Sequence, residues 1–174
     1  MRPKHAIAWT NAVPEFPLRF RPILSPEVGQ KLYVTVLSSR IVGVLTHFVH
    51  SRVRPCVGLE AGCEGCLAKR AKRWKGYLAV WWRLEAREAI AEITAQGGLD
   101  NKALLSASGP DLRGWQLTMW RRGRKVNGPS LAEFAPPPVG GPEVPPSFDV
   151  ARQLCHIWGL DESLVDDLAL PSEQ

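Results

Sequence analysis

The sequence predicts a mainly β fold, a small antiparallel barrel with one long inserted loop. Short runs rich in β-branched and aromatic residues recur between residues 31 and 134, with turn residues between them. An irregular stretch with three cysteines, residues 50–75, interrupts these runs. Hydrophobic residues make up 45% of the 174 residues, which is enough for a core and excludes a wholly disordered chain.

The expected elements follow a proline-rich start. Residues 1–27 contain five prolines and little periodicity, so we expect an N-terminal arm. Residues 83–94 fit either a helix or the return strand of a hairpin, and residues 99–107 fit a short helix. Five or so short strands with one long insertion favour an OB-fold, with a β-sandwich as the alternative. The expected strands are 31–37, 40–49, 76–82, 112–120 and 126–134.

The C-terminal part is expected to form a linker, a helix and a tail. Residues 135–147 hold six prolines and two glycines, which predicts a semi-rigid linker and a domain boundary. Ser147 suits the N-cap of a helix that Gly159 ends. The predicted organisation is an arm (1–27), an OB-like domain (28–134) with its inserted loop at 47–75, a linker (135–147), a helix (148–159) and an acidic tail (160–174).

Charge is distributed unevenly along the chain. Residues 1–159 hold all 22 Lys and Arg with 12 acidic residues, a net charge of +10, whereas residues 160–174 hold five acidic residues and no base. Basic clusters lie at residues 52–75, with seven bases and two acids, and at 113–125, with five bases and no acid. This asymmetry favours a polyanionic partner, and ordinary solvated surface charge is the alternative.

Several classes of protein are excluded by the sequence. The longest apolar run, residues 77–82, is much shorter than the roughly 20 residues of a membrane span. No apolar stretch follows the basic N-terminus, so we expect a cytoplasmic protein and no membrane partner. Phosphate-binding glycine loops, Gly-x-Ser-x-Gly and His-Glu-x-x-His are absent, so we expect no enzymatic activity and no catalytic residues.

The most specific motif is a cluster of cysteine and histidine. Cys63 and Cys66 have the Cys-x2-Cys spacing that places two thiolates at adjacent corners of a tetrahedron, and Cys56 supplies a third sulfur. His47 or His50 completes the set, and His47 is favoured because a strand fixes the direction of its side chain. Three cysteines with one histidine form a closed zinc site, so we expect a structural Zn²⁺ rather than catalysis.

A metal ion would stabilise this segment, because residues 50–75 are too polar and glycine-rich to fold by burial. Structural zinc supplies about 10–16 kcal/mol of apparent binding free energy, which would also order the basic run 69–75. The alternative is a set of free or buried thiols. Cys155, on the predicted C-terminal helix, is expected to be a buried apolar residue.

Aromatic and basic residues alternate in the two basic clusters. Proteins hold single-stranded nucleic acid in this way, because bases stack on aromatic rings while Lys and Arg follow the phosphates. Trp74 is the best stacking candidate because basic residues surround it in the sequence, whereas Trp81 and Trp115 are expected in the core. The predicted nucleic-acid-binding residues are Arg52, Arg54, Lys69, Arg70, Lys72, Arg73, Trp74, Lys75, Tyr77, Trp82, Arg113, Trp120, Arg121, Arg122, Arg124 and Lys125.

The combination of these features resembles a known family. A β-rich barrel with a basic surface, an acidic tail and an inserted loop that reads His47…Cys56…Cys63-x2-Cys66 resembles the zinc-containing OB-fold single-stranded DNA-binding proteins, such as the helix-destabilising protein of T-even phages. The motif over residues 46–77 also resembles small proteins of phages and bacterial mobile elements. The resemblance implies these four residues as the zinc ligands and a tail that contacts replication or recombination proteins.

We therefore expect a zinc-stabilised single-stranded DNA-binding protein with little sequence preference, acting in replication, recombination or transposition of a phage or mobile element. Its partners would be single-stranded DNA, or RNA, and a replication or recombination protein at the tail, with a homo-oligomer left open. Two alternatives remain: a zinc-stabilised protein–protein adaptor of a nucleoprotein complex, and an RNA-binding zinc protein.

Overall fold

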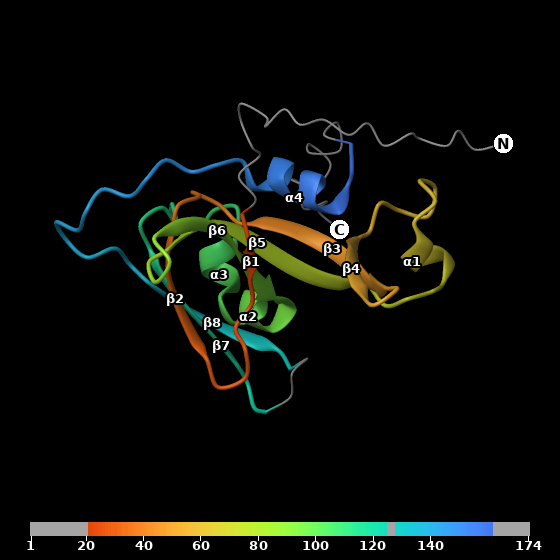
Figure 1. Cartoon of the computed structure of the whole chain (residues 1–174), viewed down its shortest axis with the longest axis horizontal. Coiled ribbons are helices and arrows are strands. Elements are labelled where there is room, and N and C mark those ends of the chain that lie inside the picture. Colours follow the sequence, from red (N-terminus) through yellow and green to blue (C-terminus); the bar gives the residue numbers. More distant parts are fainter. Residues whose placement is uncertain (1–20, 125–127, 162–174) are drawn as a thin grey trace, which may run out of the picture.

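A computed structural model describes residues 21–124 and 128–161 (Figure 1). Most of the predicted N-terminal arm, Lys125 and all but the first two residues of the acidic tail lie outside the described residues. No helix in the described ranges is long and apolar enough to span a membrane.

The described secondary structure is mainly β. Its strands are β1 (Ile23–Leu24), β2 (Lys31–Val36), β3 (Val42–Val49), β4 (Arg52–Pro55), β5 (Arg73–Trp82), β6 (Arg87–Thr94), β7 (Gln116–Arg121) and β8 (Ser130–Ala135). Its helices are α1 (Glu64–Leu67), α2 (Ala95–Asp100), α3 (Lys102–Leu105) and α4 (Val150–Trp158).

Strand β5 is the centre of the sheet, because it pairs with three other strands. One edge of β5 follows β6 from Lys75 to Trp82. On the other edge, residues 73–77 pair with β3 and residues 80–82 pair with β2. The sheet order is β1-β6-β5-β2-β7-β8, and β3 carries β4 as a branch on β5.

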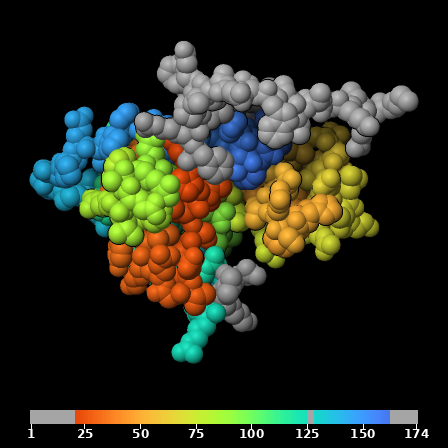
Figure 2. Space-filling view, in the orientation of Figure 1, coloured from red at the N-terminus to blue at the C-terminus, as the bar shows by residue number. Residues whose placement is uncertain are grey.

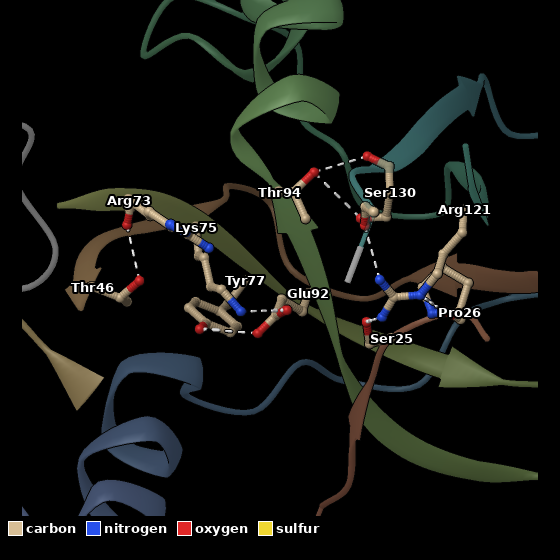
Figure 3. A network of polar contacts seen from close by, with 11 residues as sticks. Ser25, Pro26, Thr46, Arg73, Lys75, Tyr77, Glu92, Thr94, Arg121 and Ser130 are labelled. Atoms are coloured by element: carbon tan, nitrogen blue, oxygen red, sulfur yellow. Dashed lines mark hydrogen bonds and ion pairs between the residues drawn. The ribbon is translucent and has the colours of Figure 1, made fainter. Parts of the chain in front are cut away.

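The predicted small antiparallel barrel is wrong. The sheet is mixed, because β1 runs parallel to β6, and its path ends at β1 and β8 without pairing these two strands in the described part of the chain. One edge of β5 is divided between the β3–β4 hairpin and the β2–β7–β8 ribbon, so the sheet branches rather than closes (Figure 1). The Thr94 hydroxyl of β6 donates to the carbonyl of Ser130 in β8, which links these strands through a side chain (Figure 3).

Both faces of β5 are buried, which explains its nearly continuous apolar sequence. Leu78 and Val80 belong to a core that β5 forms with β2, β6 and β7. Tyr77 and Ala79 lie on the opposite face, in a second core that α4 closes through Val150, Leu154 and Trp158. The fold therefore has one sheet, a core on each face of its central strand, and a helix covering one of them.

One open prediction is decided and two others change in the structure. Residues 83–94 form the return strand of the hairpin and not a helix: a turn leads into β6, which pairs antiparallel with β5 and whose alternating Ala89, Ala91 and Ile93 enter the first core. The short helix predicted over 99–107 is replaced by α2 and α3. Strand β4 lies inside the stretch 50–75, where no strand was expected, because pairing with β3 outweighs its polar sequence.

Helix α4 returns to the sheet at the end of the proline-rich linker. The predicted N-cap Ser147 is wrong: Asp149 caps the helix, and its carboxylate accepts a hydrogen bond from the N–H of Arg152 at 3.0 Å. Gly159 ends the helix in the left-handed conformation, at φ 65°. Cys155 is fully buried in this helix, as predicted.

Lys75, Tyr77 and Glu92 form a polar group between β5 and β6 (Figure 3). The Lys75 ammonium lies 2.6 Å from the Glu92 carboxylate, and the Tyr77 hydroxyl donates to the same carboxylate at 3.3 Å. Burial, helped by the negative charge of Glu92, raises the pKa of Tyr77 above its ordinary value of 10.0.

We predict that this buried tyrosine makes stability fall at high pH. Unfolded Tyr77 ionises above about pH 10 while the folded residue stays protonated, so the free energy of unfolding decreases by about 1.4 kcal/mol per pH unit beyond that point. Urea denaturation between pH 8 and about 11 should show this decrease in the native protein and a shallower one in Tyr77→Phe. Tyr33→Phe, at a residue 61% exposed on β2, is the matched control and keeps the native slope.

Candidate metal centre

The structure brings together His47, Cys56, Cys63 and Cys66, which we call the metal centre. Their ligand atoms all lie within 4.8 Å of one another. The Cys66 Sγ is 3.5 Å from both the Cys56 Sγ and the His47 Nε2. Tetrahedral zinc with its usual bond lengths requires ligand separations of about 3.5–3.8 Å. The cysteines are free thiols, so the geometry fits a metal ion and not a disulfide.

Two neighbouring elements deliver the first two ligands. His47 is a buried residue near the end of β3, and its partner in the ladder is Arg54 of β4. Cys56 follows β4 directly, and its N–H donates to the carbonyl of Leu45 at 2.7 Å. The β3–β4 hairpin therefore sets the distance between the imidazole and the first thiol.

Helix α1 delivers the other two ligands. Cys63 is the residue before the helix, and the N–H of Leu67 donates to its carbonyl at 3.0 Å. Cys66 lies within α1, one turn later. A Cβ on Gly65 would lie 2.3–2.6 Å from atoms of the His47 side chain, so glycine is required here by the close approach of that side chain. Gly62, in contrast, is required by its positive φ of 74°.

His47 is the histidine of the centre and His50 is not. The His47 Nδ1 lies 3.0 Å from the carbonyl oxygen of Arg70, so this nitrogen can donate while Nε2 faces the thiols. Metal-bound histidines use this arrangement, because the second ring nitrogen fixes the orientation of the ligand. His50 is exposed at φ 49°, and its imidazole lies 3.7 Å from the Glu64 carboxylate.

The thiols affect one another's ionisation. Hydrogen bonding with the Cys56 thiol and burial raise the pKa of Cys66 to about 11. Burial also opposes the ionisation of Cys63, but N–H donors of Cys66, Val57 and Gly65 outweigh it and lower its pKa. A cation beside the thiols would offset the raised pKa of Cys66, so the donor set has the chemistry of a closed site for a soft or borderline divalent metal.

Eight of the basic residues that were predicted to bind nucleic acid fall into two groups. Six of them lie near the metal centre, and the other two lie elsewhere. Figure 2 shows the loop after β4, in gold and yellow, at a different end of the molecule from the tip of the β7–β8 hairpin. All eight are exposed residues. Those near the centre are Arg52, Arg54, Lys69, Arg70, Lys72 and Arg73, and those at the hairpin tip are Arg122 and Arg124.

Four other predicted contacts serve the fold instead. Tyr77 is 1% exposed, so the prediction that it contacts nucleic acid is wrong. Lys75 is ion-paired with Glu92 in a partly buried position. The other two donate to backbone carbonyls, Arg113 to those of Leu37, Val144 and Pro145 and Arg121 to those of Pro26 and Gly128.

The predicted tryptophans are half-buried. Trp82 lies 5.4 Å from the Arg87 guanidinium and Trp120 lies 5.6 Å from the Lys31 ammonium, measured to the ring centroids. Trp74 packs against the edge of the first core. Sequence reasoning missed Leu45, which is 48% exposed and lies directly opposite Trp74 on β3.

Two adjoining cavities separate the centre from α4. One, of about 300 Å³, is lined by His47, Cys63 and Arg54, and the other, of about 270 Å³, is lined by Arg52 and Arg54. Trp158, at the end of α4, lines both. This side of the molecule is therefore hollowed, and the lining of its two cavities combines Arg52 and Arg54 with the acidic Glu64 and Glu92.

Comparisons of the chain with protein-family models, with curated proteins and with solved structures find no match.

We predict that metal binding depends on His47 and not on His50. His47→Ala removes the fourth ligand, so metal affinity should fall by at least about tenfold and the thermal midpoint should fall with it. His50→Ala removes a histidine of the same strand end that lies outside the centre and should keep the native metal content. The measurement is metal content by elemental analysis after gel filtration, with competition by a chelator. Equal metal loss in both variants would contradict the assignment.

Proposed function

We propose that the protein binds single-stranded nucleic acid, with little sequence preference, through a basic surface that a structural zinc ion holds in place. The hydrogen-bond distance between the His47 Nδ1 and the Arg70 carbonyl carries the proposal. This contact joins a ligand residue of the metal centre directly to the backbone of residues 69–73, which we call the basic segment. Single-stranded DNA is the primary ligand, and RNA is tested beside it.

Zinc suits the donor set better than other common metals. Three thiolates and one imidazole form a closed tetrahedral site for Zn²⁺, whereas Mg²⁺ and Ca²⁺ prefer oxygen ligands. Four protein ligands leave no position for a reactive water, which supports a structural ion in a protein that is not an enzyme. The ion would supply folding free energy to a loop that has few buried apolar residues.

The basic segment leaves the metal centre with its backbone fixed. The N–H groups of Lys69 and Arg70 donate to the carbonyls of Cys66 and Gly65 at 3.0 and 2.8 Å. At the other end, the Thr46 hydroxyl donates to the carbonyl of Arg73 at 2.9 Å (Figure 3). With its backbone held at both ends, the segment presents four positive side chains to solvent at little further entropic cost, as phosphate binding requires.

Single strands fit this surface better than duplexes. Trp74 follows the basic segment directly, and an aromatic ring beside basic residues is how proteins bind unpaired bases. The helix nearest the centre, α1, has four residues and carries Glu64, so it does not provide a recognition helix for the major groove. The strand would pass from the basic segment toward Arg52 and Arg54 beside α4.

One observation favours a second candidate, the zinc-stabilised adaptor. The loop around the metal centre exposes Val57, Leu59 and Leu67, and the last two are 60% and 64% exposed. Exposed apolar side chains on an ordered loop are suited to a protein partner. Nucleic-acid titration separates the two functions, because an adaptor of this kind would not respond to a naked strand.

We predict that two charge reversals in the basic segment weaken binding selectively. In a tryptophan-fluorescence titration with oligo-dT, the same-length RNA and a DNA duplex, the native protein should prefer a single strand and lose affinity as salt rises. Lys69→Glu combined with Lys72→Glu should make the negative slope of log affinity against log salt shallower by about 1.4, because each lost phosphate contact removes about 0.7 from its magnitude.

The matched control reverses the same number of charges at the hairpin tip. Arg122→Glu combined with Arg124→Glu should change the slope less than the double variant of the basic segment. A native protein that binds no nucleic acid at low salt would overturn the proposed function and favour the adaptor. Equal slopes in both double variants would show that general charge, and not the metal-ordered segment, drives binding.

A further inference from the structure

The indole of Trp74 lies against three glycines from three different elements. A Cβ built on Gly43 of β3, Gly76 of β5 or Gly98 of α2 would lie 2.8, 2.6 or 2.5 Å from an atom of this ring. Distances this short do not occur for real Cβ atoms, so none of the three positions accepts a side chain while the ring stays in place. We call these three residues the glycine seat.

The backbone does not require glycine at these positions. None of the three has a positive φ, whereas seven other glycines of the described residues do. Glycine weakens both strands and helices, and Gly43 pairs directly with Gly76 across β3 and β5. The missing side chains at Gly43 and Gly98 therefore leave space for the indole alone, and the one at Gly76 leaves space for both the indole and Ile41, at some cost to local stability.

The seated ring lies at the border between the first core and the surface. Trp74 is half-buried, and the glycine beside its Nε1, Gly43, is exposed. Leu45, opposite Trp74 on β3, is 48% exposed, and Leu99, next to Gly98, is 67% exposed. The basic segment ends at Arg73, immediately before the ring. An aromatic ring with apolar neighbours and adjacent positive charge has the composition of a base-stacking platform.

The seat also shares a strand with the metal centre. Gly43, Leu45 and His47 lie at alternate positions of β3, so the strand that carries the zinc ligand also carries one side of the seat. Leu45 accepts a hydrogen bond from the N–H of Cys56, the second ligand. The orientation of the ring is therefore fixed from two directions, by close packing on glycine and by the metal-bound hairpin.

We propose that Gly43, Gly76 and Gly98 are positioning residues that hold Trp74 as a preformed stacking platform for an unpaired base. This inference rests on the proposed function, because it specifies how that surface recognises its ligand. Stacking reads the flat face that all bases share, so the platform accepts any base and rejects a strand without bases.

The experiment compares two single strands of equal length, oligo-dT and a strand with an abasic centre. The native protein should bind oligo-dT more tightly. Trp74→Ala should weaken oligo-dT binding by about 5- to 150-fold, the range expected for one stacked base. The variant protein should bind the two strands with equal affinity. Gly98→Ala should have a similar effect although Trp74 is intact, because its new methyl group displaces the ring.

Two further variants separate positioning from general packing. In a Trp74→Phe background, Gly98→Ala should change affinity little, because phenylalanine lacks the outer ring atoms that crowd position 98. Gly97→Ala crowds Ile93 and Ala132 instead of the indole, so it should lower the thermal midpoint without changing the preference of the folded protein for oligo-dT.

The outcomes are distinct. If Trp74→Ala weakens binding and Gly98→Ala does not, the seat is wrong and the proposed function stands. If the native protein binds both strands alike, stacking by Trp74 is wrong and binding is electrostatic. If it binds neither strand, the seat and the proposed function both fail.

Discussion

Three thiols and an imidazole with ligand atoms within 4.8 Å of one another form a constraint that the other parts of the functional surface depend on. The neighbouring thiols of Cys56 and Cys63 raise the pKa of Cys66 to about 11, and a divalent cation among them would offset that cost of ionisation. In the loop between β4 and β5 only Cys63 and Gly65 are buried, so little else in it favours one conformation. Metal binding and folding of this loop are therefore one event in our account.

The effect of the centre reaches the charged surface through short backbone connections. His47 contacts the basic segment at Arg70, and Cys56 contacts β3 at Leu45. Strand β3 connects these contacts to Gly43, which lies against the indole of Trp74. Because β5 is the central strand and begins at the end of the basic segment, the metal loop is an extension of the sheet and not a separate module.

The sequence predicts the parts of the molecule that depend on residue type and spacing. The ligand set could be found because Cys-x2-Cys spacing and a strand-borne histidine are local signals, and His47 is confirmed over His50 as a member of the cluster. The open, branched sheet could not be found, because the pairing of β5 with three strands depends on contacts far apart in the chain. The burial of Tyr77 and the glycine seat could not be predicted for the same reason, because both depend on contacts between distant parts of the chain. A glycine within a strand, such as Gly43, indicates that another group approaches closely, but the sequence does not identify that group.

We propose that the metal centre orders the basic segment and thereby creates the binding surface. Amide hydrogen exchange of zinc-loaded and chelated protein, read at Lys69 and Arg70 together with oligo-dT affinity, would test this proposal, with the amides of the β5–β6 ladder as the internal reference. Chelation should remove protection at these two amides and remove binding, the ladder should stay protected, and added Zn²⁺ should restore both protection and binding. Full oligo-dT affinity in chelated protein that has lost protection at Lys69 and Arg70 would contradict it.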